Sequence, residues 1–235
     1  FMQYDRAGNL AAAYDTAGNR SSYTYDSRGN LLSETVTDKT TGISATKTYN
    51  YDLNNNLIEE IDAAGNKVVS QYDALGRAEK NLWYAAGSTT PKTTEYTYDA
   101  DGNCTAVTDF AGNTVRSVYD SLGRLTEQYD ALGNLVSRNT YDGNGRQTMA
   151  EDALGSRTLY QYDADGNLAS TTDALGNVTT NTYDIYGNVT SVTDPLGNTT
   201  SYQYNARDQL ICTVLPSGST TTYFYDNAGN LTAQE

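Results

Sequence analysis

A six-residue string, Tyr-Asp-x-x-Gly-Asn, recurs along the whole chain and constrains its fold more than any other feature. The first copy is Tyr4–Asn9 and the last is Tyr225–Asn230, with degenerate copies such as Thr172–Asn177 in most of the gaps. Self-similarity at a fixed period predicts a repeat architecture. A chain built from one small unit copied end to end more often forms an extended surface than a single active site.

The aspartates of this string define a repeat with two distinguishable halves. From Asp99 to Asp194 their spacing is mostly 10 and 11 residues in alternation, with one gap of 12, so the full repeat is about 21 residues. We name the turns by the residue that usually precedes the aspartate. First-class turns, with Tyr there, include those of Asp99, Asp120, Asp142, Asp163 and Asp184; second-class turns, often with Thr or Ile, include those of Asp62, Asp109, Asp173 and Asp194, with Tyr129 and Glu151 as exceptions.

Each half-repeat is typical of one turn followed by one strand. The aspartate can accept hydrogen bonds from backbone N–H groups of the turn, and the glycine three residues later supplies a positive φ. The structural turn residues are expected to be Asp99 with Gly102, Asp163 with Gly166, Asp173 with Gly176, Asp184 with Gly187, and Asp194 with Gly197. About six residues rich in Thr, Val, Leu, Tyr and Ser lie between turns, which is strand composition at strand length.

The fold class that follows is all-β. Tandem β-hairpins are expected to form one long curved antiparallel sheet, an open spiral over residues 1–235, because loops this short join only antiparallel neighbours. The alternation of 10 and 11 residues would move side chains to the opposite face of the sheet unless a bulge absorbs the difference. We therefore expect one bulge per repeat, at one end of the hairpins.

The composition argues against a thick aliphatic core. Hydrophobic residues make up 37% of the chain, and tyrosine accounts for 21 residues against three Phe and one Trp. Cross-strand tyrosine ladders would stabilise a single sheet, with the hydroxyls hydrogen-bonded or close to water.

The net charge of −14 follows from the recurring turn aspartates and disfavours nucleic acid as a partner, since no basic stripe is present. The chain contains no apolar run long enough to predict a membrane span. It starts and ends inside a repeat, so we expect residues 1–235 to be a fragment of a longer repeat protein.

Residues that carry chemistry are scarce. Histidine is absent, which removes the commonest general base and metal ligand, and Cys104 and Cys212 are most simply small apolar residues within the repeat. The strings beginning at Asp99 and Asp163 resemble the start of a calcium loop but lack its downstream glutamate. The sequence therefore predicts no catalytic residue, no metal site, no cofactor and no enzymatic activity.

Two second-class turns are longer than the others, around residues 37–42 and 83–92. Insertions in repeat arrays often emerge on one binding face or edge. The second insertion contains the sole tryptophan, so Trp83 and the adjacent Tyr84 are candidates for contact with a partner. The alternative is a hairpin extension with no functional role.

Tyr-Asp-x-x-Gly-Asn repeats at this spacing, from Tyr4 to Asn230, resemble the YD repeats of the RHS family, which includes bacterial RHS toxins, wall-associated proteins, shell components of insecticidal toxin complexes and teneurins. The resemblance implies a β-strand ribbon that spirals into a hollow shell, enclosing a C-terminal toxic domain in the bacterial toxins. Toxin members also have an Asp-Pro-containing self-cleavage motif. Asp194-Pro195 only superficially resembles that motif, because it lies in register as an ordinary second-class turn.

Two functions remain open from the sequence. The leading one is a structural shell segment that encapsulates or scaffolds a toxin or effector domain of a larger secreted or surface protein of bacterial type. The alternative is a carbohydrate- or cell-surface-binding module that uses exposed tyrosines and the two insertions.

Overall fold

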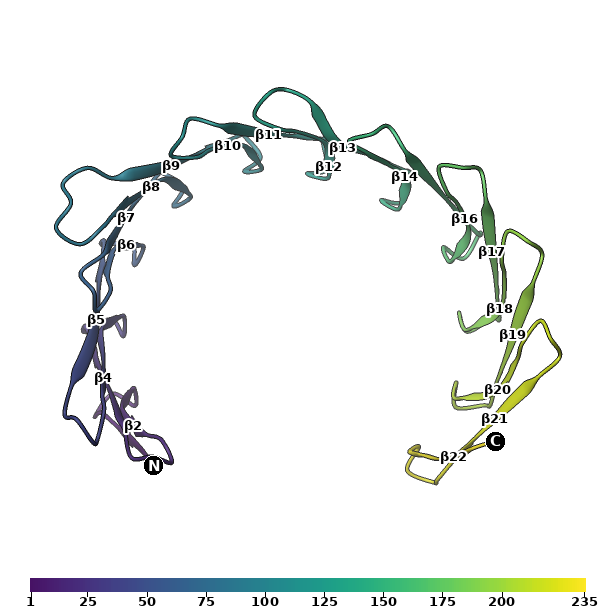
Figure 1. Ribbon diagram of the computed structural model, residues 1–235, viewed down its shortest axis with the longest axis horizontal. Helices are drawn as coiled ribbons and strands as arrows, with labels where there is room; N and C mark the ends of the chain where they lie inside the picture. Colours follow the sequence, from purple (N-terminus) through teal and green to yellow (C-terminus); the bar gives the residue numbers. More distant parts are fainter. The chain divides into compact units, whose positions relative to one another are not determined.

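The structure, a computed structural model, describes residues 1–235, and all of its regular elements are β-strands (Figure 1). The strands are β1 (Met2–Tyr4), β2 (Leu10–Tyr14), β3 (Arg20–Tyr25), β4 (Leu31–Thr37), β5 (Ser44–Tyr51), β6 (Leu57–Ile61), β7 (Lys67–Tyr72), β8 (Ala78–Tyr84), β9 (Lys92–Tyr98), β10 (Cys104–Thr108), β11 (Thr114–Tyr119), β12 (Leu125–Tyr129), β13 (Leu135–Tyr141), β14 (Gln147–Asp152), β15 (Arg157–Tyr162), β16 (Leu168–Thr172), β17 (Val178–Tyr183), β18 (Val189–Thr193), β19 (Thr199–Tyr204), β20 (Leu210–Val214), β21 (Thr220–Tyr225) and β22 (Leu231–Gln234). The chain divides into two compact units, residues 1–117 and 118–235, and the division falls within β11. No helix of the length and hydrophobicity needed to cross a membrane is present.

Both units are meanders in which each strand pairs antiparallel with the next. In the first unit the pairing runs from β1 through β11, and in the second from β12 through β22. The expected all-β fold of tandem antiparallel hairpins is confirmed. Loops of a few residues leave room for no other connection between neighbouring strands.

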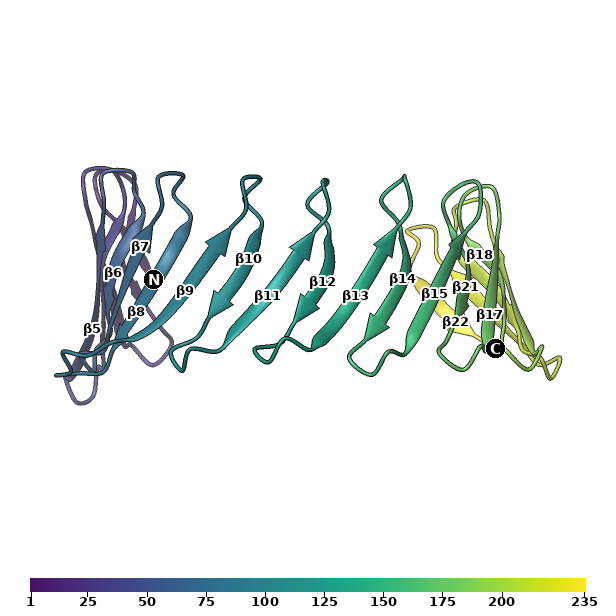
Figure 2. The same ribbon diagram turned by 90° about the horizontal axis from the view of Figure 1, so that it is seen from above.

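The two classes of turn lie at opposite ends of the strands, and we call the two rows of turns the first-class edge and the second-class edge. Odd-numbered strands lead into first-class turns and even-numbered strands into second-class turns, so each edge carries one class (Figure 2). Within each unit the strands turn progressively and the sheet curves, with the second-class turns splayed on the convex side (Figure 1). The long loops after β4 and β8 therefore emerge at the second-class edge.

A β-bulge accompanies the first-class hairpins, as the spacing predicts. In the pair β15–β16 the register shifts between Gln161 and Tyr162, and the same shift precedes the tyrosine of the equivalent hairpins. The second-class pairs are regular except β12–β13, where the shift precedes Tyr129. That hairpin is followed by the single 12-residue gap, so the extra residue of β13 is absorbed by its bulge.

The sheet is a single layer with almost no buried core. Ala12 is the only buried hydrophobic residue, and no large side chain is fully buried. Most strand residues are half-buried, because each face is covered only by the side chains of neighbouring strands. The shortage of aliphatic residues in the sequence thus corresponds to a sheet with no second layer to pack against.

Candidate functional site

The repeated turn is a closed hydrogen-bonded unit built on its aspartate. In the turn of Asp163, the Gly166 N–H donates to the Asp163 carbonyl at 3.2 Å, and the Asp163 N–H donates to the Asn167 carbonyl at 2.9 Å. Oδ1 of Asp163 accepts from the N–H groups of Asp165 and Asn167, and Oδ2 accepts from the Asn167 side chain at 3.0 Å. Both carboxylate oxygens are therefore used inside the turn.

The expected positive φ is present at the turn glycines, with values of 95° at Gly166, 83° at Gly176, 88° at Gly187 and 85° at Gly197. Gly102, with a φ of 93°, has the same geometry. The hydrogen bond from the Asn167 side chain lowers the pKa of Asp163, and burial acts in the opposite direction. The net result is a pKa below the ordinary value of an aspartate. Because the N–H groups of the turn donate hydrogen bonds to the charged carboxylate, each turn favours an ionised aspartate.

The strings that resemble a calcium loop use their carboxylates in the same way. Oδ1 of Asp99 accepts from the Asp101 and Asn103 N–H groups, and Oδ2 accepts from the Asn103 side chain. No group of three potential ligands that could hold a metal ion is found in residues 1–235. Cys104 and Cys212 are half-buried thiols in different units.

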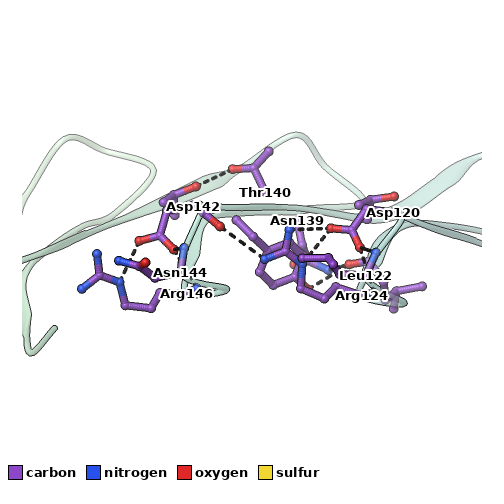
Figure 3. A network of polar contacts seen from close by, with 12 residues as sticks. Asp120, Leu122, Arg124, Asn139, Thr140, Asp142, Asn144 and Arg146 are labelled. Carbon is purple, nitrogen blue, oxygen red and sulfur yellow. Dashed lines mark hydrogen bonds and ion pairs between the residues drawn. The ribbon is translucent and has the colours of Figure 1, made fainter.

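Arginine replaces the closing asparagine in three first-class turns and links one turn to the next. The Arg124 Nε donates to Asp120 Oδ2 at 2.7 Å, which keeps the turn closed, and its Nη1 donates to the Asp142 carbonyl at 3.3 Å (Figure 3). Its guanidinium also lies over the Tyr141 ring, 4.6 Å from the centroid. Arg77 makes the equivalent three contacts with Asp73, Asp99 and Tyr98, and Arg146 stacks on Tyr162 at the same distance.

Replacing Arg124 by Asn is expected to separate these two roles. Asn closes most first-class turns, so the turn itself should persist, whereas the bond to Asp142 and the stack on Tyr141 would be lost. The expected fall in the free energy of unfolding is about 0.5–1.5 kcal/mol, the usual net value of one hydrogen bond at a partly exposed site. Urea denaturation followed by circular dichroism measures this free energy of unfolding. An Arg124→Lys variant as stable as the wild type would contradict a role for the planar guanidinium, which stacks on Tyr141 and bonds both turns.

Tyrosine hydroxyls also connect successive repeats. The Tyr183 hydroxyl donates to the Leu168 carbonyl at 2.9 Å, and Tyr204 and Tyr225 donate to Val189 and Leu210 in the same way. The accepting carbonyl belongs in each case to the first residue of the preceding even strand. The ring-to-ring contact in the structure joins Phe1 and Tyr14, whose centroids are 5.9 Å apart. It does not continue from strand to strand as a ladder of tyrosines, so the expectation of stacked tyrosine ladders was wrong. The rings are held by hydroxyl bonds and arginine instead.

The two long loops brace the second-class edge. The Lys39 N–H donates to Asn19 Oδ1 at 3.0 Å, and the Ala86 N–H donates to Asn66 Oδ1 at 3.1 Å. Asn19 and Asn66 close the preceding second-class turns. Each insertion therefore reaches back to its neighbouring turn along the edge.

The structure places the two predicted contact residues on opposite faces. Trp83 and Tyr84 are consecutive in β8, so their side chains alternate across the sheet. Tyr84 packs under Lys67, whose ammonium lies 4.8 Å from the ring centroid. Trp83 instead lines a groove with Lys92 and Phe110, a residue that sequence reasoning missed. The sequence signal for Phe110 is a bulky aromatic residue at a turn position that Ala or Ser usually occupies.

A second irregular cluster lies on one face of the second unit. Arg138 Nε donates to Glu127 Oε1 at 2.9 Å, and Tyr129 donates to the other oxygen of Glu127. Glu151, which is buried, accepts from Arg157 at 3.1 Å and lies 3.7 Å from Arg138. The hydrogen bond from Tyr129 lowers the pKa of Glu127. Every charge in this cluster is paired, which suits a bracing role across β12 to β15.

Family models identify these repeats. The model described as Teneurin YD-shell matches residues 2–158, and the model described as RHS Repeat matches residues 141–178, 162–198, 183–215 and 204–235. The chain belongs to the RHS and YD-repeat family. No curated protein sequence matches it.

Solved toxin-complex structures share the YD-repeat fold. The chain superposes on TcdB2-TccC3 with a TM-score of 0.71 at 20% sequence identity, and on TcdB2-TccC3-TEV with 0.70 at 19%; each match covers 98% of this chain and 15% of the other. A Photorhabdus luminescens Tc holotoxin pore with a mutation in TccC3 matches over 99% of this chain and 14% of its own, with a TM-score of 0.69 at 20% identity. This YD-repeat chain therefore spans about one seventh of the length of those structures.

Proposed function

We propose that this chain is a segment of shell wall, part of a longer secreted or surface protein of bacterial type, and that the complete shell encloses or scaffolds a toxin or effector domain. The observation that carries the proposal is the single-layer sheet, which has no core of its own. A wall of this kind gains its function from what it surrounds. Its match to toxin-complex structures over nearly its whole length supports the same role.

The hydrogen bonds between repeats hold neighbouring turns and strands together, as a continuous wall requires. Turns are joined to turns by the arginine bonds, and strands to strands by the tyrosine hydroxyls and the bulged pairing. The aspartates that open the turns are hydrogen-bonded within those turns, as at Asp163, and we assign no catalytic step to this chain. Turnover of a glycan or peptide by the purified chain that one Asp substitution abolished would contradict that part.

Protection from protease tests the enclosing role. In the full-length polypeptide that carries this segment, the domain that follows the repeats should resist digestion while the wall is intact. Gly166→Val together with Gly176→Val should open the wall and expose that domain, whereas the matched pair Gly166→Asn and Gly176→Asn should leave it protected, because asparagine tolerates positive φ. If that domain were digested in the unsubstituted protein as fast as in the valine and asparagine variants, the wall would not enclose it.

A further inference from the structure

Four exposed leucines, which we call the leucine row, lie along the second-class edge of the second unit. Each occupies the place two residues after the aspartate of its turn: Leu132 is 87% exposed, Leu154 91%, Leu175 88% and Leu196 87%. The N–H of each leucine donates to Oδ1 of that aspartate at 2.8–2.9 Å. The four backbones are therefore held in the same way, and the side chains project from successive turns of one edge.

The turn itself does not require leucine at this place. In the second-class turns of the first unit the equivalent residue is alanine, at Ala17, Ala64 and Ala111, and the turn hydrogen bonds are the same. In the first-class turns of the second unit the residue varies and includes Asn144 and Asp165. Leucines that are almost fully exposed contribute little to the fold, whereas apolar side chains gathered along one edge are typical of a binding surface.

The leucine row has a defined spacing and length. Its members are 22, 21 and 21 residues apart, which is two strands of the sheet, or roughly 10 Å at about 4.8 Å per strand. The row is bounded by Ala111 in the preceding second-class turn and by Ser217 in the following one. Seven residues of an α-helix rise about 10.5 Å, so a helix with an apolar residue at every seventh position matches all four leucines. These turns lie on the convex side of the sheet, where a helix can approach them (Figure 1).

The charges beside the leucine row favour a basic partner. Residues 118–235 contain 14 acidic and five basic residues, which gives a net charge of −9. The five-residue turns that begin at Asp130, Asp152, Asp173 and Asp194 contain no Lys or Arg. A second copy of this chain would bring like charges together at this edge, whereas Lys and Arg on the flanks of a helix would meet opposite charges.

We propose that the leucine row docks a basic amphipathic helix of a partner protein. The apolar stripe of that helix covers the four leucines, and its Lys and Arg side chains face the turn aspartates. Docking at this edge is independent of what the wall encloses.

Binding of a synthetic peptide to the purified chain tests the leucine row. The probe is a fluorescein-labelled peptide with four leucines spaced seven residues apart, alanine between them on the same face and lysine at the flanking positions. Fluorescence anisotropy should show saturable binding that weakens as salt is added. A peptide of the same composition in scrambled order, and one with glutamate in place of lysine, should each bind at least about tenfold more weakly.

Alanine within the leucine row supplies the specific variant. Leu154→Ala combined with Leu175→Ala should weaken binding of the lysine peptide at least about tenfold, because two leucine side chains are no longer buried in the complex. The matched control is Leu122→Ala, which should leave the affinity unchanged. Leu122 is 70% exposed and holds the same place in a first-class turn, at the opposite edge, with the same bond from its N–H to the aspartate. Circular dichroism confirms that each variant is folded.

Three results with the peptides would overturn the proposal: no saturable binding of the lysine peptide, equal affinity for the scrambled or glutamate peptide, or an equal loss of affinity in the Leu122 variant. Two further results would overturn the choice of a helix. Dimers in sedimentation that the Leu154 and Leu175 substitutions abolish would assign the leucine row to a second copy of the chain. Binding to phosphatidylcholine vesicles that the same substitutions abolish would assign it to a lipid surface.

Discussion

Acidification from about pH 5 to about pH 2 is expected to unfold the sheet, because the aspartates that open the turns all have lowered pKa values in the folded state. Hydrogen bonds within each turn cause the lowering, and the pKa of Asp26 falls to about 2. The same direction is found at Asp5, Asp15, Asp38, Asp52, Asp62, Asp73, Asp99, Asp109, Asp120, Asp130, Asp142, Asp152, Asp163, Asp173, Asp184, Asp194 and Asp226.

The sign follows from the direction of these shifts. A group whose folded pKa lies below its unfolded value contributes stability that is complete above the unfolded pKa, here 3.8, and is lost as the pH falls through the folded pKa. Each turn contributes little because its aspartate is at most half-buried, but the turns titrate over the same interval, so their losses accumulate. Circular dichroism at a series of pH values should show a steep transition below about pH 4.

Asn205 supplies the control for this prediction. It opens a first-class turn in place of aspartate, and its Oδ1 accepts from the N–H groups of Arg207 and Gln209 as an aspartate would. Asp163→Asn should therefore keep the turn, lose its share of the acid sensitivity and be less destabilising at pH 7 than Asp163→Ala. An acid transition that is equally steep after Asn replaces several turn aspartates would contradict the role of their ionisation.

The sequence predicts this fold well because the information is local. The aspartate, the glycine three residues on and the strand-forming residues that follow lie within one half-repeat, so the turn at Asp163 can be derived without its neighbours. The bulges could also be derived, since they follow from spacing. Contacts between hairpins could not: Arg124 reaches Asp142 only because of the register and curvature of intervening strands.

The groove shows the same limit from the functional side. A tryptophan within an insertion predicts a contact residue, and its neighbour along the chain, Tyr84, is predicted with it. Adjacency in a strand puts two side chains on opposite faces. The residues that meet Trp83 are Lys92, across the β8–β9 pair, and Phe110, from the next hairpin. Identifying them required the pairing register, which a single sequence does not fix.

Replacing a turn glycine such as Gly166 by Val should destabilise the protein more than other turn substitutions do, by roughly 1–3 kcal/mol, because a β-branched residue is strained at positive φ. Gly166 has a φ of 95°, and a Cβ there would lie 3.3 Å from an Arg146 Nη atom. Gly176, with a φ of 83° and no atom within 4 Å of its Cβ position, isolates the backbone strain. Since Arg146 can move, the two valine variants should agree within about 0.5 kcal/mol.

Asparagine at the same positions separates strain from the mere loss of glycine. Asn55 and Asp208 occupy the equivalent turn positions with φ values of 67° and 58°, so this backbone already accommodates short polar side chains. Gly166→Asn should therefore retain most of the stability that Gly166→Val loses, as measured by urea denaturation. Repeats are coupled mainly to their neighbours, so hydrogen exchange should rise first in β15 and β16 of the valine variant. Equal destabilisation by Asn and Val, or exchange that rises uniformly along the second unit, would show that the glycine does not act through its backbone conformation.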